Sequence, residues 1–575
     1  MSQEKLRFDV NHLELALTAS SKDELARQGE ELEELEKRYG VWESCKQNKL
    51  ALFYILAAYS CAAAWGYDTI ANTATLALPS FQRYFGVHMD ETNSYYLESI
   101  WTSLWASMTG IGQVVGSVIA GPISQRIGRR YTAMGSGTVS VLGVTLQYLA
   151  TQNGVLLAGK IINGAAVGGL LSIGTTYASE ISPPRLRGIL LGGFPYFAIA
   201  MQCMGLTIIR ILVPNTSPIS FRIALGLQWL VGGIPIIFFF FVPESPNYLL
   251  LRGRAPEARR AASRLYNPQT VPARMAHLEN SIYTELQKAR ELSQASYLDC
   301  FRGTDLKRTL TVCLLMFGNG LNGSAFLTQN LYFLDIAGLP TIRGFDINIG
   351  GFALALVVIP LSWMFGDRIG RRTLYLIGVS GNIIGMAVVG GLGYVTDNKG
   401  VIWAVAVLLN LLISWQLITS FMVSWTMSPE LSSYTLRQPT QSIGICMQAL
   451  NSWFFAFVTP YMYNIGPGSG KLGAKTGFVF AGTSILLWVM AWLWLPETRG
   501  LGTEELDRLY EERVSPREFG REVRRLRARG KMAGSMGSGE GSIDARERER
   551  ERVDIGAGQF RRLSSAAELQ PKGVC

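Results

Sequence analysis

Twelve apolar stretches divide this chain, and they constrain its fold more than any other feature. Each is close to the roughly twenty residues that an α-helix needs to cross the hydrocarbon core of a bilayer. A bilayer offers backbone groups no partners of its own, so each crossing segment must form its hydrogen bonds within a helix. The sequence therefore predicts an all-α membrane protein whose twelve transmembrane helices lie near residues 49–70, 99–121, 131–150, 154–177, 188–212, 221–243, 309–336, 347–366, 373–395, 400–425, 439–463 and 475–496.

Basic residues are distributed unevenly between these stretches. A net charge of +10 could suggest a nucleic-acid partner. However, the basic motifs lie in alternate gaps, at QRIGRR (125–130), PPRLRG (183–188), LKRTL (306–310) and DRIGRR (367–372). An excess of Lys and Arg on one side is typical of the cytoplasmic loops of membrane proteins. We therefore expect both termini in the cytoplasm and membrane lipid as a partner, with no nucleic acid.

Cysteine and histidine residues predict no metal or cofactor site. The seven cysteines contain no CxxC pair, and the three histidines lie outside the apolar stretches. The segment GPGSGK (466–471) is followed by Leu472, where a phosphate-binding loop needs Ser or Thr to hold magnesium. The sequence thus predicts neither an enzyme nor an ATP-driven pump, and no bound cofactor or metal.

Two short motifs occur twice, once in each half of the chain. QRIGRR returns as DRIGRR, and the pair Glu180 and Arg187 returns at the same spacing as Glu430 and Arg437. Two six-helix halves in parallel repeat are typical of secondary transporters, whose substrate site lies between the halves. The predicted organisation is an N-terminal tail (1–48), an N-terminal half (49–246), a helical linker (247–308), a C-terminal half (309–496) and a C-terminal tail (497–575), with residues 515–575 disordered.

Six motifs occur in an order that resembles the sugar porter family of the major facilitator superfamily. They are GYD (66–68), QRIGRR, YASEISPPRLRG (177–188), PESP (243–246), DRIGRR and PETRGLGTEELDRLYEERV (496–514). Within that family, SAFLTQNLYFLDIAGL (324–339) is most similar to fungal α-glucoside permeases. The resemblance implies two pseudo-symmetric six-helix halves. It also implies a monomeric plasma-membrane carrier that moves a sugar or glycoside-like solute by alternating access, as a proton-coupled symporter.

Two other functions remain open at this stage. A nutrient sensor with little transport activity has the same fold, although such sensors tend to have longer tails. An exporter of a secondary metabolite would suit a substrate pocket with few polar side chains.

Asp68 and Lys160 are the two ionisable residues predicted deep inside the membrane. Counted from the cytoplasmic ends of their helices, both lie about 28–30 Å from the inner face, so they can meet. In the family that the chain resembles, the Asp of GYD couples transport to protons. The Lys160 position usually holds Arg there. The alternatives are a purely structural ion pair, or two side chains that extend to the outer interface.

Substrate-binding side chains are only partly retained. Alignment of the motifs with sugar porters implies that Gln202, Asn319, Asn322 and Trp425 line the substrate site. Several family hydrogen-bonding positions are replaced here, because Pro195, Gly320, Ala325 and Ala355 stand where amides are usual, and Trp65 stands where many α-glucoside permeases have Glu. We expect a pocket with fewer polar groups and more room. The alternative for the retained amides is hydrogen bonding between helices, and for Trp425 it is packing.

The repeated charged motifs predict a gate at the cytoplasmic rim. Arg–carboxylate contacts there are expected to hold the two halves together in the outward-facing state. The expected gating residues are Arg126, Arg129, Arg130, Glu180, Arg187, Glu244, Asp367, Arg368, Arg371, Arg372, Glu430, Arg437 and Glu497. Asn215 begins an N-glycosylation sequon in a short loop predicted to lie outside the cell.

Overall fold

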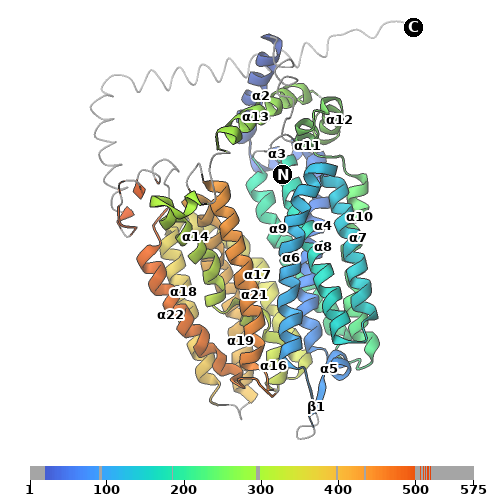
Figure 1. Cartoon of the computed structure of the whole chain (residues 1–575), viewed down its shortest axis with the longest axis vertical. Coiled ribbons are helices and arrows are strands. Elements are labelled where there is room, and N and C mark those ends of the chain that lie inside the picture. The colour runs from blue at the N-terminus through green and yellow to red at the C-terminus, as the bar shows by residue number, and fades with distance from the viewer. Residues whose placement is uncertain are drawn as a thin grey trace.

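The described part of the chain is almost wholly helical in the computed structural model (Figure 1). This structure describes residues 20–89, 94–183, 185–267, 269–292, 298–395, 399–432, 436–465 and 467–498, together with 506, 509, 510, 512, 514–516, 518 and 519. Nearly all of the predicted disordered tail, and the first 19 residues, lie outside this part of the chain.

The N-terminal half begins after two helices that precede the membrane region, α2 (Ser20–Arg38) and α3 (Val41–Gln47). Its long helices occupy the first six predicted spans. They are α4 (Lys49–Ala74), α6 (Ser99–Ile127), α7 (Arg129–Leu149), α8 (Asn153–Ile181), α9 (Arg187–Leu212) and α10 (Pro218–Phe241). Between α4 and α6 lie η2 (Thr75–Ala77), α5 (Pro79–Phe85) and an antiparallel hairpin of β1 (Val87–Met89) and β2 (Ser94–Tyr96), in which Val87 pairs with Tyr96.

The linker and the C-terminal half are also built from helices. The linker contains α11 (Pro246–Leu251), α12 (Ala255–Leu265), α13 (Val271–Leu292) and η3 (Asp299–Phe301). The C-terminal half contains α14 (Gly303–Leu321), α15 (Ser324–Thr328), α16 (Asn330–Ile336), α17 (Thr341–Ile369), α18 (Arg371–Leu392), α19 (Lys399–Gln416), the π-helical η4 (Leu417–Phe421), α20 (Met422–Leu431), α21 (Arg437–Tyr463), η5 (Gly473–Lys475) and α22 (Thr476–Trp494).

Ten helices of the described chain are long and apolar enough to cross a membrane by composition alone. The two expected spans outside that set are 131–150 and 309–336. The first forms α7, which is a single helix with many small and polar residues. The second is not the single helix that the sequence predicts, because Gly323 adopts a left-handed φ of 80° and divides it after α14.

The two halves stand side by side, with α4–α10 on the right and α14–α22 on the left of Figure 1. The linker helices and α2 cap one end, which we call the linker end. The β hairpin and α5 lie at the opposite end, which we call the hairpin end.

Contacts between the halves gather at the hairpin end. Gln82 on α5 donates a hydrogen bond to Asp335 on α16 (2.7 Å), and the Tyr332 hydroxyl accepts one from the Leu97 backbone N–H (3.0 Å). The hydroxyls of Ser99 and Ser469 lie 2.7 Å apart. Arg210 on α9 also forms an ion pair with Asp346 on α17. The halves are thus bonded to each other at this end.

Helix α2 packs along α13 at the linker end (Figure 1). Glu36 forms an ion pair with Arg274, and the His277 Nε2 atom lies 2.9 Å from a Glu33 carboxylate oxygen. Gly29 sits so close to α13 that a Cβ atom there would lie 2.4 Å from the backbone oxygen of Ala273. The two helices therefore dock through a glycine contact flanked by charged pairs.

Candidate functional site

A buried polar cluster joins α4, α8 and α10 inside the N-terminal half. Asp68 and Lys160 are 3% and 1% exposed, and the structure places both in this cluster. They are connected through Asn72. The Asn72 amide N–H donates to Asp68 Oδ1 (3.1 Å), and its carbonyl oxygen accepts a hydrogen bond from the Lys160 ammonium. The expected meeting of acid and base is therefore indirect, since no ion pair within 4.0 Å joins these two described residues.

A second amide extends the cluster. The Asn163 Nδ2 group donates to Asp68 Oδ1 (2.7 Å) and to Gln228 Oε1 on α10 (2.8 Å), and its own Oδ1 accepts from the Ser140 hydroxyl (2.7 Å). The second Asp68 oxygen is buried and accepts no hydrogen bond from the described residues.

The sequence reasoning missed Asn72, Asn163, Ser140 and Gln228. A signal for two of them exists, because Asn72 lies four residues after Asp68 and Asn163 lies three after Lys160. At those spacings side chains share one face of a helix.

The C-terminal half contains an uncharged polar cluster. The Asn382 Nδ2 group donates to the backbone oxygen of Asn322 (3.0 Å) and to the Ser484 hydroxyl (3.0 Å). Gln416 donates to the same Asn322 oxygen and to Asn382 Oδ1, both at 2.8 Å. Asn322 is fully buried. Its side-chain Oδ1 accepts from Asn382 at 3.4 Å, while its Nδ2 group is buried and makes no hydrogen bond within the described chain. Its role in substrate binding remains a proposal.

Asn319 faces a different environment where α14 packs on α21. Its Nδ2 group is buried and makes no hydrogen bond within the described chain, and the same is true of Asn451 Oδ1 and Gln448 Oε1 on α21. Buried amides without partners are costly unless a ligand or water satisfies them. These three amides, together with Asn322, are therefore candidates for substrate contacts in the C-terminal half. Asn451 and Gln448 were not among the residues expected from the sequence.

Gly320 does not enlarge the pocket, contrary to expectation. A Cβ atom at this position would lie 2.3 Å from the Phe455 ring and closer still to Asn451 Oδ1. Side chains of α21 already fill the space that an amide at 320 would use. The Asn451 amide of α21 therefore occupies the space that a side-chain amide at residue 320 would take.

The other expected substrate residues are spread over separate helices. Gln202 is half-buried on α9, while Trp425 on α20 is 45% exposed with its ring centroid 6.3 Å from that of Phe421. Ala325 and Ala355 are buried, so neither position presents a polar group. The structure does not bring Gln202 and Trp425 into contact with each other.

The repeated basic motifs form two equivalent turns at the linker end. Gly128 and Gly370 end α6 and α17 with φ values of 101° and 95°, a conformation that favours glycine. A carboxylate then caps the next helix. Glu244 accepts hydrogen bonds from the backbone N–H groups of Arg129 (2.9 Å) and Arg130 (3.2 Å), and Glu497 accepts one from Arg371 (2.9 Å). The charged motifs therefore fix the entry into α7 and α18.

Each described gate ion pair lies within one half. Arg129 donates to Glu180 (2.9 Å) in the N-terminal half, and Arg371 contacts Glu430 in the C-terminal half. The expected clamp between halves is not formed by these pairs. In this conformation the halves are joined at the hairpin end instead, so the clamp remains a prediction for the opposite conformation.

The remaining expected gating residues serve the turns or lie apart. Arg130 and Arg372 donate to the backbone oxygens of Phe240 and Trp492 respectively. The Arg126 side chain is exposed, and its backbone oxygen accepts a hydrogen bond from the Tyr248 hydroxyl (2.9 Å). Arg187 is exposed at the start of α9. The side chains of Asp367, Arg368 and Arg437 lie outside the described part of the structure.

Glu244 and Asn215 occupy contrasting surroundings. Burial raises the pKa of Glu244 above its ordinary value, and the backbone hydrogen bonds from Ser245, Arg129 and Arg130 partly offset this rise. Asn215 is exposed between α9 and α10, where its Oδ1 accepts a hydrogen bond from the Ser217 backbone N–H (3.0 Å). Its glycosylation remains a prediction.

Comparison with known proteins places these features in a family. Residues 54–510 match the family described as sugar (and other) transporter. The chain is 40% identical over 494 residues to the MFS transporter fmqE of Aspergillus fumigatus, covering 84% of this chain and 92% of that protein. It is 26% identical to the general alpha-glucoside permease of Saccharomyces cerevisiae, covering 89% of this chain and 86% of the permease.

Solved structures agree with the fold. The inward-open conformation of the xylose transporter XylE from E. coli superposes with a TM-score of 0.62 at 19% identity, covering 80% of this chain and 99% of XylE. The expected all-α, twelve-helix fold is thereby confirmed, and the chain is a multi-pass membrane transporter rather than an enzyme. As the sequence predicted, the chain belongs to the sugar (and other) transporter family of the major facilitator superfamily.

Proposed function

We propose that this protein is a secondary transporter that exports a poorly hydroxylated organic solute, a secondary metabolite, by alternating access. The observation that best supports export is the small number of hydrogen-bonding side chains in the expected substrate region. Pro195 replaces an amide on α9, and the buried side chains of Ala325 and Ala355 offer no hydrogen bonds. A solute with many hydroxyl groups needs more donors and acceptors than these positions provide.

The relatives support the same proposal. The permeases named for α-glucosides share about a quarter of their residues with this chain, at 26% identity. The more similar fmqE, at 40%, is named as an MFS transporter without a sugar. Asn319, Gln448 and Asn451 then supply a few directed hydrogen bonds, which suits an apolar solute that has isolated amide or carbonyl groups.

Proton-coupled uptake of a sugar or glycoside is the second candidate. The buried Asp68–Asn72–Lys160 chain favours coupling to protons, because an acid this deep is costly unless it has a partner or a task. Protonation of Asp68 would weaken its hydrogen bonds to Asn72 and Asn163 and loosen α4 from α8. Such a step can drive export in exchange for protons as readily as symport.

The direction of transport depends on which side of the membrane each end of the molecule faces. With the linker end in the cytoplasm of a plasma-membrane protein, the contacts at the hairpin end close the outer side. The present conformation is then the one that loads solute from the cytoplasm. Rearrangement of the Arg129–Glu180 and Arg371–Glu430 pairs would accompany the switch. A nutrient sensor with little transport activity is the third candidate.

The experiment is a ligand screen followed by directional transport. The purified full-length protein is tested by thermal shift against glucose, maltose, polyols, aromatic glycosides and nitrogen-containing aromatic metabolites. Hits are then followed in proteoliposomes with an imposed pH gradient. Export predicts stabilisation by the last class and proton-driven movement of that solute. Strongest stabilisation by maltose or glucose would favour the second candidate, and stabilisation without transport would favour the sensor.

A further inference from the structure

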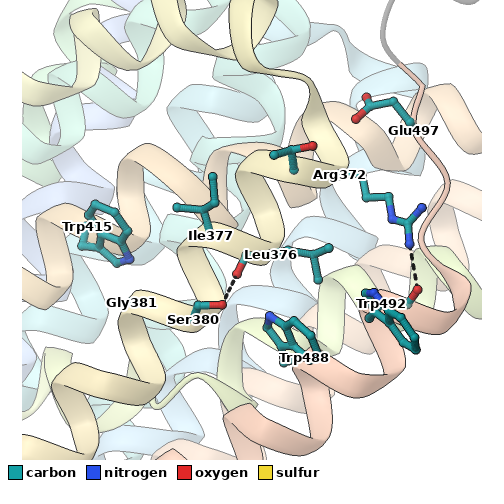
Figure 2. Close-up of a pocket in the computed structure, with 10 residues that line it drawn as sticks. Arg372, Leu376, Ile377, Ser380, Gly381, Trp415, Trp488, Trp492 and Glu497 are labelled. Carbon is teal, nitrogen blue, oxygen red and sulfur yellow. Dashed lines mark hydrogen bonds between the residues drawn. The ribbon is translucent and has the colours of Figure 1, made fainter. Parts of the chain in front are cut away.

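A groove on the surface of the C-terminal half lies apart from the polar clusters described above. It runs between α18, α19 and α22 and has a cavity volume of about 790 Å³ (Figure 2). Three tryptophans line it, Trp415 from α19 and Trp488 and Trp492 from α22, with Arg372 and Glu497 at one end. Two of its lining residues, Ile377 and Trp492, are 45% and 42% exposed on membrane-spanning helices, so the groove opens toward the bilayer.

The groove has a polar end and an apolar floor. Arg372 lies in the first turn of α18, and Gly381 lies further along the same helix, about 14 Å away at 1.5 Å per residue. Arginine in the first turn of a membrane-spanning helix lies at the depth of lipid headgroups. The floor beyond it, at Leu376 and Ile377, reaches into the hydrocarbon region.

One indole in the groove lacks an acceptor. The Trp488 and Trp492 rings are stacked, with centroids 6.3 Å apart and an interplanar angle of 8°. Trp415 donates its Nε1–H to the Gly378 backbone oxygen (2.8 Å). The Trp488 Nε1–H is buried and has no hydrogen-bond partner among the described residues. A ligand with an acceptor at that point would satisfy this donor.

The N-terminal half shows that the fold does not require the tryptophans. The repeated motifs align Arg372 with Arg130 and Glu497 with Glu244, and both arginines donate to a backbone oxygen of the last membrane helix of their half. In the same alignment, Val139 corresponds to Gly381 and Pro235 corresponds to Trp488. The arginine and the carboxylate are thus common to both halves, whereas the indole of Trp488 has no counterpart at the aligned position, Pro235.

We propose that this groove is a binding site for a glycerophospholipid whose headgroup has a single phosphate. The phosphodiester accepts hydrogen bonds from the Arg372 guanidinium and the Trp488 indole, and an acyl chain lies along Leu376 and Ile377 beside the stacked rings of α22. Glu497 at the same end repels additional negative charge, which excludes polyphosphorylated headgroups. A sterol has one hydroxyl and no phosphate, so it offers the guanidinium no anionic group.

The test is native mass spectrometry of the full-length protein released from detergent with phosphatidylglycerol. Trp488→Phe retains a ring but removes the donor, and Arg372→Ala removes the charge. The matched control is Arg130→Ala in the N-terminal half. We expect each C-terminal variant to bind the lipid about fivefold more weakly, while the control binds as the unmodified protein does.

Two further measurements test whether the variants are folded and whether binding is specific for a phospholipid headgroup. Unfolding temperatures establish that Trp488→Phe is folded, because this substitution alters no backbone contact. Competition with a sterol separates a headgroup site from a general apolar surface. Equal binding by all variants, an equal loss in the Arg130→Ala control, or displacement of the phospholipid by an equimolar sterol would each overturn the proposal.

Discussion

At the scale of single residues, Asn72 is the side chain that organises the buried charges. It donates to Asp68 and accepts from Lys160, so its amide has one possible orientation while both neighbours are charged. Burial of a carboxylate or an ammonium is costly unless hydrogen bonds replace those lost from water. The amide supplies one such bond to each group and keeps the two charges apart. Protonation of Asp68 removes the acceptor that fixes this orientation.

Replacement of Asp68 by Asn tests whether this cluster couples transport to protons. The amide resembles the protonated acid permanently, so we expect loss of concentrative transport with retained exchange of solute. The measurement is solute accumulation in proteoliposomes with and without a pH gradient. Lys160→Arg serves as the conservative control and should retain accumulation. Gradient-driven accumulation by Asp68→Asn would assign the proton to another group.

Replacement of Asn72 by Leu tests the bridging role. The change leaves Lys160 without its carbonyl acceptor and Asp68 with one donor fewer, so we expect a loss of about 2 kcal/mol in the free energy of unfolding. Asn382→Leu in the uncharged cluster of the C-terminal half is the comparison, and it should cost less because its partners are neutral. Denaturation in detergent measures both. A smaller loss at Asn72 than at Asn382 would contradict the bridge.

Asp68 and Lys160 could be identified from sequence because ionisable residues are rare inside apolar stretches. Amides and hydroxyls are common there, so nothing distinguished Asn72 or Asn163 before the helices were packed. Gly320 shows the limit more clearly. The sequence suggests extra space, but Asn451 fills that space from another helix, and this depends on which faces of α14 and α21 meet. Local patterns contain no information about such a contact.

At the scale of elements, the turns before α7 and α18 explain why one basic motif occurs twice. Each needs a glycine with positive φ to reverse the chain and a distant carboxylate to cap the new helix. The sequence predicted these turns as loops and topology signals. It did not predict that Glu244 and Glu497 act on backbone N–H groups, because both residues lie on segments that are far away in sequence.

Replacement of Gly128 by Ala should damage this turn more than the same change at Gly370. A Cβ atom at 128 would lie 2.2 Å from a Glu244 carboxylate oxygen, compared with 2.9 Å from Glu497 at 370. The left-handed conformation adds about 1–2 kcal/mol at either site. The control is Gly121→Ala on α6, where a Cβ atom meets no atom within 4 Å. Unfolding temperatures should rank the three variants in that order, and equal losses at 128 and 121 would refute the argument.

Replacement of Glu244 by Gln should change how stability depends on pH. Burial raises the pKa of this carboxyl from its model-peptide value of 4.5, so the folded protein holds the proton more tightly than the unfolded chain. The contribution of Glu244 is therefore largest below pH 4.5 and decreases as the pH rises through the raised pKa. Glu244→Gln lacks this decrease. The stability of the variant relative to the unmodified protein should rise across that interval in detergent, and a parallel pH profile would contradict it.

At the scale of the whole molecule, the hairpin end holds the halves together in this conformation. Its bonds link α5, α6, α9, α16 and α17, whereas the described gate pairs at the linker end stay within one half. Fold class and the two-half organisation followed from the repeated motifs and the helix lengths. The conformational state did not, because one sequence must stabilise both states of an alternating-access carrier to nearly the same extent.

A pair of cysteines at Ser99 and Ser469 should lock the protein in this state. Their hydroxyl oxygens are 2.7 Å apart, so two sulfur atoms can form a disulfide with little movement. We expect oxidation to abolish transport and a reductant to restore it. The single variants Ser99→Cys and Ser469→Cys are the controls and should be insensitive to oxidation. Full transport by the cross-linked protein would show that this end does not open.

The docking of α2 on α13 also has a consequence for biosynthesis. Glu36 can pair with Arg274 only after Arg274 has left the ribosome. By then every membrane helix of the N-terminal half has been synthesised. Domains generally assemble in the order of their synthesis. The first described helix therefore fastens the linker to a completed N-terminal half before α14 leaves the ribosome. A nascent chain stalled far enough past residue 292 for α13 to clear the ribosome should already protect α2 from proteolysis.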